Sequence, residues 1–292
     1  MSRAALAGAG LSVALAAGAA AAPTDLLRER AFVVAADARC GLFDARTAAA
    51  LAAGRAQARN TAIRAGASSA QIAEAEAEAR RRASGLACTS PEVRAAAERV
   101  RSAHEAFARL ERITYPGEIG EWRADRGVGA RPRWRLAQTT TIGGRTGVFG
   151  LAGRDGSEAL LAVAEFPNGR RPYAARLVMR DVRRTSGPVL DRRGARAGEA
   201  VPLARRLPAG TGTRSFQAQA REAAPDALAP AGMKRGWAFR FPDEAVAAMA
   251  RLDPREAVAV EFLFSGAPET VRAYVEVGDF AAARQFLTLA AR

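Results

Sequence analysis

The spacing of apolar and polar positions changes once along the chain. Between residues 25 and 112, apolar side chains recur every three to four positions, which predicts amphipathic helices. Asp44 is placed to cap the second helix and Ser68 or Ser69 the third, while Ser90 and Pro91 begin the fourth. The predicted helices cover residues 25–39, 44–65, 68–85 and 91–112.

Beyond residue 132 the period becomes two, as in half-buried strands. Trp237, Phe239 and Phe241 alternate with Ala238 and Arg240. Turn residues at 153–156 and 167–169 separate further strands, and two helices interrupt the series, at about 243–251 and 279–290. Short strands at this spacing favour an antiparallel sandwich or barrel. The remaining predicted strands lie near 133–136, 145–152, 157–166, 173–183, 258–264 and 271–277.

Residues 113–132 fit neither period. Gly and Pro residues, among them Pro116, Gly117 and Pro132, interrupt any helix there, which predicts a linker open to proteolysis. The expected fold class is α+β: a disulfide-tied antiparallel helical bundle at 22–112, the linker at 113–132, and a β-sandwich or barrel-like domain with two short helices at 133–292.

Residues 1–21 have the three parts of a cleavable secretory signal. Arg3 supplies a positive start, Leu6 to Ala17 is apolar, and small residues run from Gly18 to Ala22. The apolar part is shorter than the roughly 20 residues that span a bilayer. Cleavage after Ala21 or one residue earlier predicts a periplasmic or secreted protein, and no later segment is apolar enough to cross a membrane.

An oxidising compartment favours pairing of the two cysteines. The second and third predicted helices are of similar length and joined by a short turn, so we expect them to form an antiparallel hairpin. Cys40, just before the second helix, and Cys88, just after the third, would then lie at adjoining ends, so the sequence predicts a Cys40–Cys88 disulfide. Two cysteines and one histidine are too few ligands for a structural zinc site. No metal and no cofactor are expected.

The end of the chain resembles a known family. Gly236 to Phe241, the helix after it, the strand 258–264 and the closing Val275-Glu276-Val277-Gly278-Asp279-Phe280-Ala281-Ala282-Ala283 are similar to the end of the invasion-associated locus B family. Members of that family are small exported β-domain proteins, so the resemblance implies export and a non-enzymatic role. It covers about the last 55 residues. This chain has no Cys in 113–292, where the family usually has disulfides, and its helical part is not part of the family.

Charge is concentrated in the second half of the chain. Residues 22–125 hold 16 Arg and 14 acidic residues, whereas 126–214 hold 18 Arg against 6 acidic residues. Guanidinium groups pair bidentately with phosphate and carboxylate, so nine arginines in or beside the long loop 185–212 form a candidate anion-binding site. They are Arg170, Arg171, Arg183, Arg184, Arg192, Arg193, Arg196, Arg205 and Arg206. The alternative without a binding role is that codon usage in a GC-rich genome enriches Arg, and that these side chains only keep strand edges and loops soluble.

Enzyme signatures are absent from the sequence. The single histidine, His104, shares the apolar face of the fourth predicted helix, which favours a structural role. No Gly-x-Ser-x-Gly elbow, phosphate loop or Ser-x-x-Lys motif is present. A glycosidase-like pair of carboxylates is still open and would have to come from Glu165, Asp181, Asp243 and Glu244.

Two functions from different classes follow. The first is a non-catalytic envelope protein that binds another envelope protein or an anionic surface: lipopolysaccharide, phospholipid or acidic glycan. Export disfavours nucleic acid as the partner. The second is a cell-wall or polysaccharide hydrolase that uses two carboxylates. A cleft with two acidic groups roughly 5–10 Å apart distinguishes the second from the first.

Overall fold

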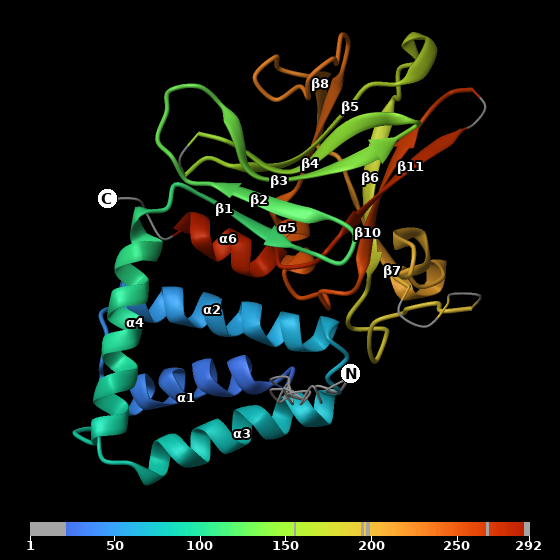
Figure 1. The fold of residues 1–292 in the computed structure, drawn as a ribbon. Helices are drawn as coiled ribbons and strands as arrows, with labels where there is room; N and C mark the ends of the chain where they lie inside the picture. Colours follow the sequence, from blue (N-terminus) through green and yellow to red (C-terminus); the bar gives the residue numbers. More distant parts are fainter. Residues whose placement is uncertain (1–21, 155, 194–195, 197–198, 267–268, 289–292) are drawn as a thin grey trace, which may run out of the picture.

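The computed structural model describes residues 22–154, 156–193, 196, 199–266 and 269–288. The predicted signal segment, residues 1–21, lies outside this range. The described residues form six α-helices and two antiparallel sheets (Figure 1), so the mixed helical and β class is confirmed. None of the described helices is long and apolar enough to cross a membrane.

The helical part consists of α1 (Asp25–Cys40), α2 (Ala45–Arg64), α3 (Ser69–Gly85) and α4 (Pro91–Arg109). The predicted caps form: the side chains of Asp44, Ser68 and Ser90 each accept a hydrogen bond from a backbone N–H in the first turn of α2, α3 and α4. α1 packs against both α2 and α3, while α4 crosses their ends (Figure 1). α1 therefore lies between α2 and α3, the two consecutive helices that a short turn joins.

The predicted disulfide is present. Cys40 is the last residue of α1 and Cys88 follows α3, and their Cα atoms lie 5.7 Å apart. Arg39 supports the same junction, because its guanidinium donates to the carbonyl oxygens of Ser84 and Leu86. The bond thus joins the C-terminal ends of two helices that pack side by side.

The stretch 113–132 is not the linker that its composition predicts. It contains most of β1 (Arg112–Pro116) and all of β2 (Glu121–Asp125), which pair as a hairpin. The turn of this hairpin lies on the buried carboxylate of Glu276, which accepts hydrogen bonds from the backbone N–H groups of Glu118, Ile119 and Gly120 at 2.7–2.8 Å. A carboxylate contributed from far along the chain therefore orders a segment rich in Gly and Pro.

The larger sheet has seven strands in the order β1-β2-β3-β4-β5-β9-β8. The further strands of this sheet are β3 (Arg133–Ile142), β4 (Arg145–Gly153), β5 (Ala159–Ala164), β8 (Ala220–Ala223) and β9 (Trp237–Phe241). The smaller sheet has the order β11-β10-β6-β7, with β6 (Ala174–Arg180), β7 (Thr213–Gln217), β10 (Ala257–Leu263) and β11 (Thr270–Glu276). The strands predicted near 145–152, 157–166, 173–183, 237–241, 258–264 and 271–277 all form.

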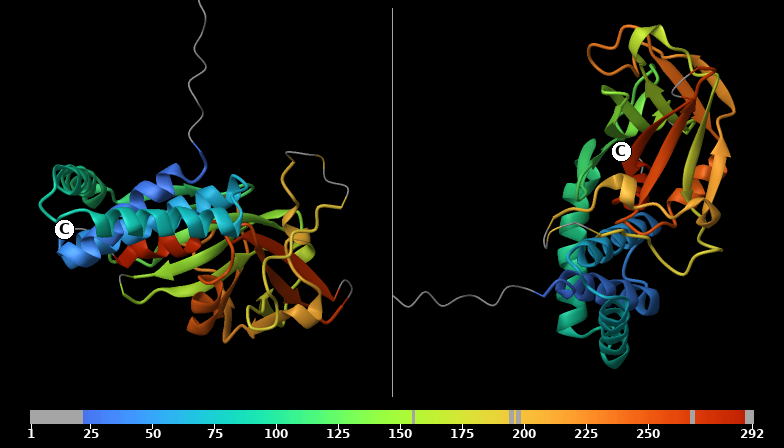
Figure 2. Two further views of the ribbon diagram at one scale, coloured as in Figure 1. Left: turned by 90° about the horizontal axis from the view of Figure 1, so that it is seen from below. Right: turned by 90° about the vertical axis from the view of Figure 1, so that its right-hand side faces the viewer.

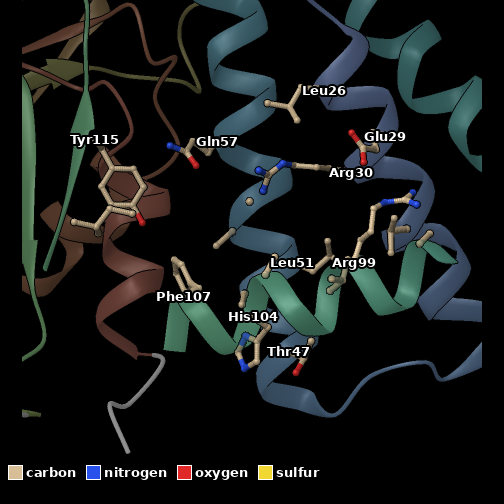
Figure 3. A pocket seen from close by; sticks show the side chains of 18 residues that line it. Leu26, Glu29, Arg30, Thr47, Leu51, Gln57, Arg99, His104, Phe107 and Tyr115 are labelled. Atoms are coloured by element: carbon tan, nitrogen blue, oxygen red, sulfur yellow. The ribbon is translucent and has the colours of Figure 1, made fainter. Parts of the chain in front are cut away.

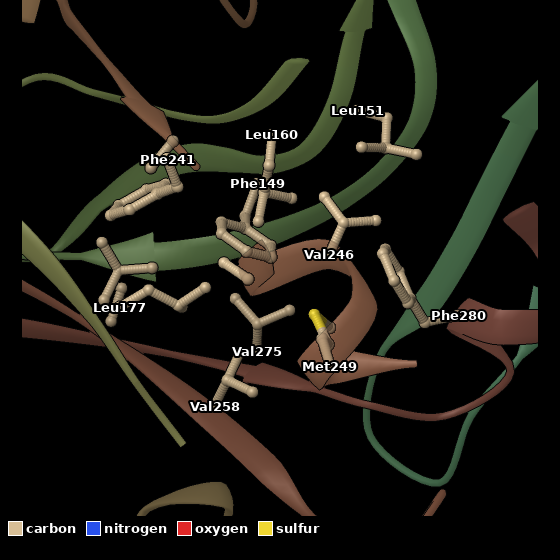
Figure 4. Packing of buried hydrophobic residues seen from close by; sticks show 14 of the residues in the cluster. Phe149, Leu151, Leu160, Leu177, Phe241, Val246, Met249, Val258, Val275 and Phe280 are labelled. Atoms are coloured by element: carbon tan, nitrogen blue, oxygen red, sulfur yellow. The ribbon is translucent and has the colours of Figure 1, made fainter. Parts of the chain in front are cut away.

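One buried cluster joins the two sheets. Phe149 and Leu160 from the larger sheet meet Leu177 and Val258 from the smaller sheet and Met249 of α5 (Asp243–Met249), as Figure 4 shows. The outward face of the smaller sheet carries Arg176, Glu261, Arg272 and Tyr274, because residues in β6, β10 and β11 alternate between the two faces. This alternation positions the candidate site described below.

The helical part packs on the β-part through α6 (Phe280–Thr288). α6 lies between α2 and the sheet (Figures 1 and 2). The rings of Phe107 on α4 and Phe286 on α6 meet edge to face at 5.3 Å. Arg126, which follows β2, donates to the carbonyl oxygens of Phe107, Ala108 and Leu110 at the end of α4. The side chain of Arg126 therefore caps the C-terminal end of α4 from the edge of the larger sheet.

Candidate functional site

The nine arginines of the predicted anion site do not converge. Arg170 and Arg171 follow the turn η1 (Pro167–Gly169) before β6, whereas the other seven follow the end of β6. A seven-residue strand is roughly 20 Å long, so the two groups lie at opposite ends of the smaller sheet. Arg170 is also engaged at the first end, where it donates to the Gly266 carbonyl and covers the ring of Phe264.

Arg206 does not belong to an exposed anion site. Its side chain is 1% exposed and contacts the carboxylate of Glu118 at 2.9 Å. It also donates to the carbonyl oxygens of Val201 and Arg255. Burial and these partners assign it a structural role, because a buried guanidinium needs such compensation.

Six arginines are left in an exposed segment after β6, which we call the arginine segment: Arg183, Arg184, Arg192, Arg193, Arg196 and Arg205. Three acidic residues, Asp181, Asp191 and Glu199, lie in the same stretch. Between β6 and β7 the described residues form no helix or strand longer than the 3-10 turns η2 (Leu203–Arg205) and η3 (Gly210–Gly212).

The acids of this segment hold individual arginines locally. The guanidinium of Arg193 contacts Asp191 at 2.7 Å, and those of Arg183 and Arg184 lie 3.6 and 3.5 Å from Asp181. Hydrogen bonds from the backbone N–H of Arg183, with the neighbouring guanidinium charges, lower the pKa of Asp181. These pairs neutralise part of the charge, but the arginine segment keeps an excess of three positive charges over its acids.

A polar groove of about 510 Å³ lies beside this segment, between the outward face of the smaller sheet and residues 204–210. Its floor carries a cross-strand triad: Glu261 of β10 pairs in register with Arg176 of β6 and Arg272 of β11. Both guanidinium groups donate to the Glu261 carboxylate, that of Arg272 at 2.7 Å. Tyr274 and the hydroxyl-bearing Thr213 and Ser215 line the same groove.

The triad has one positive charge in excess. Burial of Glu261 opposes its ionisation, but the two guanidinium groups outweigh burial and lower its pKa. The side chain of Glu261 is 6% exposed, whereas those of Arg176 and Arg272 are 41% and 55% exposed. Each guanidinium has five N–H donors, so both arginines can still bind an anion from the solvent side.

Sequence reasoning missed Arg176, Glu261 and Arg272 as site residues. The alternation of β11 places Arg272 and Tyr274 on its polar face, which was a usable signal. The register that brings Arg176 and Glu261 beside them depends on pairing between strands far apart in the chain, and no local pattern reports it.

The four candidate catalytic carboxylates do not gather in a cleft. Glu165 accepts from Arg145 and from the backbone N–H of Arg235, and Asp181 is enclosed by the turn of Arg183. Asp243 and Glu244 are exposed in the first turn of α5. The polar groove contains one acidic side chain, and so does a second, mostly apolar pocket that His104 lines. Within the described ranges, no three His, Cys, Asp or Glu side chains form a possible metal site.

Comparison with known proteins gives no match: no family model fits the chain, and neither a curated protein nor a solved structure is significantly similar to it.

Proposed function

We propose that this is a non-catalytic, exported envelope protein that docks on the phosphate groups of an anionic lipid surface. The observation that carries the proposal is the Arg176–Glu261–Arg272 triad, which leaves two guanidinium groups partly exposed on the floor of a groove. Ala204, which lines the groove, directly precedes Arg205 of the arginine segment, and that segment adds three excess positive charges. Arg recognises phosphate in two-donor geometry, and both parts of the surface supply it.

Two sequence features support the envelope location. The signal-like residues 1–21 and the resemblance to the invasion-associated locus B family both favour export. The confirmed disulfide fits an oxidising compartment. The β-sandwich assignment belongs to the same proposal and is supported by the single core that residues of both sheets share.

The alternative, a carboxylate-dependent hydrolase, lacks a supporting observation. Such a reaction needs two carboxylates on opposite sides of the bond that is cut. Glu261 is the one acidic residue in the groove, and two arginines already engage it. A carboxylate whose pKa is lowered in this way is a poor general acid.

Sedimentation with phospholipid vesicles tests the proposal. The protein should sediment with phosphatidylglycerol vesicles at low salt, should be released as salt rises, and should not bind phosphatidylcholine vesicles. Replacing Arg176 and Arg272 together by Gln should weaken binding about tenfold or more, and Gln at Arg183, Arg184, Arg192 and Arg193 should add to the loss.

The matched control replaces Arg80 and Arg94 by Gln. Both are exposed on the helical part and make no ion pair with any described residue, so this variant loses the same charge away from the groove. Equal losses in the control and in the Arg176/Arg272 variant would show that only total charge matters. Binding to an acidic polysaccharide but not to vesicles would reject the lipid surface in favour of a glycan.

A further inference from the structure

A second pocket, of about 380 Å³, lies where the helical part meets β1. Three helices contribute one stripe each, at helical spacing (Figure 3). α1 supplies Leu26, Arg30 and Val33, α2 supplies Leu51, Gly54 and Gln57, and α4 supplies Val100, His104 and Phe107. Ile113 and Tyr115 of β1 close one end. The size is within the range of small-molecule sites.

Most of the wall is apolar, but the guanidinium of Arg30 enters it without a counterion, and the more exposed Arg99 also lines it. Arg30 is half-buried and makes no hydrogen bond or ion pair with any residue that the structure describes. Gly54 permits its position: a Cβ at residue 54 would lie 2.1 Å from Nη1 of Arg30. The absence of a side chain at one point of α2 therefore makes the space in which the guanidinium lies.

Tyr115 is a further polar residue of the lining. Its side chain is 3% exposed, it lines the pocket, and its hydroxyl makes no hydrogen bond within the described part of the chain. Burial, the larger cause, and the charge of Asp279 raise its pKa, so the hydroxyl keeps its proton and can donate. Nδ1 of His104, which also lines the pocket, is buried and has no hydrogen-bond partner among the described residues; buried polar atoms are normally hydrogen-bonded, so this wall offers a polar contact to a ligand.

The opening is suited to an apolar chain. Leu26, at 47% exposure, is one of the few large apolar side chains on the surface, and it lines this pocket. The charged residues beside it are Arg30, Arg99 and Glu29, so the lining carries more positive than negative charge. Figure 3 shows Arg30 and Leu26 on one side of the pocket and Tyr115 and Phe107 on the other, with Gln57 between them.

We propose that this pocket binds a monocarboxylate amphiphile, with its carboxylate on Arg30 and its hydrocarbon chain between α1, α2 and α4. A guanidinium without a counterion selects the anionic head, because charge-assisted pairing with a carboxylate is strong. The apolar stripes of the helices, with Leu26 at the opening, select the chain. Such a ligand would fill the space between the helical part and the sheet.

The test is calorimetric titration of the full mature chain with decanoate, decanol and acetate, below the concentration at which decanoate forms micelles. Decanoate should bind with a negative heat-capacity change, decanol should bind at least about tenfold more weakly, and acetate should not bind measurably. Equal affinity for decanoate and decanol, or no binding of decanoate, would overturn the proposal.

Two variants locate the head group. Arg30→Gln should weaken decanoate binding about tenfold or more and leave decanol binding unchanged. Gly54→Ala places a methyl group where the guanidinium lies, so it should also weaken decanoate binding, although Ala is a better helix former than Gly. This second variant keeps the test valid if Arg30→Gln destabilises the fold.

Arg80→Gln on α3 is the matched control and should bind decanoate like the wild type. An equal loss in this control, or unchanged decanoate binding in both Arg30→Gln and Gly54→Ala, would reject the assignment to Arg30. None of these changes touches the polar groove, so vesicle binding should stay the same in all three variants. The two proposals can therefore fail separately.

Discussion

The guanidinium of Arg64 on α2 forms a bidentate pair with the carboxylate of Asp279, which directly precedes α6. The two contacts measure 3.0 and 3.2 Å, and Asn60 donates to the same carboxylate at 2.8 Å. The side chain of Asp279 is completely buried. One carboxylate thus ties the helical part to the end of the β-part.

Removing this carboxylate should destabilise the whole protein. In Asp279→Ala the Arg64 guanidinium, 14% exposed, loses its counterion, and breaking a buried pair on one side costs about 3 to 5 kcal/mol. Urea unfolding of the variant measures the loss. Asp226→Ala, at an exposed site, should change the free energy of unfolding by no more than about 0.5 kcal/mol. Equal losses in the two variants would contradict the prediction.

Local sequence patterns predict some elements of this fold and miss others. The caps at Asp44, Ser68 and Ser90 and most strands are predicted correctly, because each depends on residues close in sequence or on the fixed periods of helix and strand. The disulfide is also predicted correctly, but the packing of α1 on α3, not a hairpin of α2 and α3, brings its two cysteines together. The β1–β2 hairpin is missed because Gly and Pro near its turn suggest a loop, while its order comes from Glu276.

The candidate site shows the same limit. Exposure of the arginine segment follows from its composition, but the burial of Arg206 does not, since Glu118 and the Val201 carbonyl reach it only in the folded chain. The separation of Arg170 and Arg171 from the rest follows from the strand between them, which the sequence does predict. Strand register and distant ion pairs are the parts that local patterns do not report.

Limited elastase treatment should cut between β2 and β3 without separating the two parts. Residues 128–132 are exposed and include Val128 and Ala130, small apolar residues after which elastase cleaves, so this short stretch is the accessible part of the predicted linker. β2 pairs with β3 and α6 packs on α2, so the fragments should stay together in gel filtration without denaturant. Fragments that elute separately would show that the helical part is an independent module.

The disulfide should be a large contributor to stability. Cys40 and Cys88 are separated by 48 positions, and closing a loop of that size is worth about 4 kcal/mol in the chain-entropy description. Cys40→Ser with Cys88→Ser should lose about that much free energy of unfolding. Mass spectrometry of the unreduced wild type should find no free thiol. A loss below about 1 kcal/mol would mean that helix packing already holds the ends of α1 and α3 together.

The triad on the smaller sheet should make stability depend on pH in the acid range. The two guanidinium groups lower the pKa of Glu261 from its ordinary value of 4.5, so the folded state binds this proton less readily than the unfolded state. The contribution of Glu261 is therefore complete above about pH 5 and is lost as pH falls through the lowered pKa.

Glu261→Gln lacks this ionisation. The difference in melting temperature between the wild type and Glu261→Gln should be largest near neutral pH and should shrink steadily toward about pH 3. The same comparison can be made in a chain that carries Arg176→Gln and so lacks one of the two guanidinium groups. There the pKa of Glu261 should be lowered less, so the effect of Glu261→Gln on the melting temperature should shrink at a higher pH. A difference that stays constant across this range would show that the pKa of Glu261 is the same in the folded and unfolded chains.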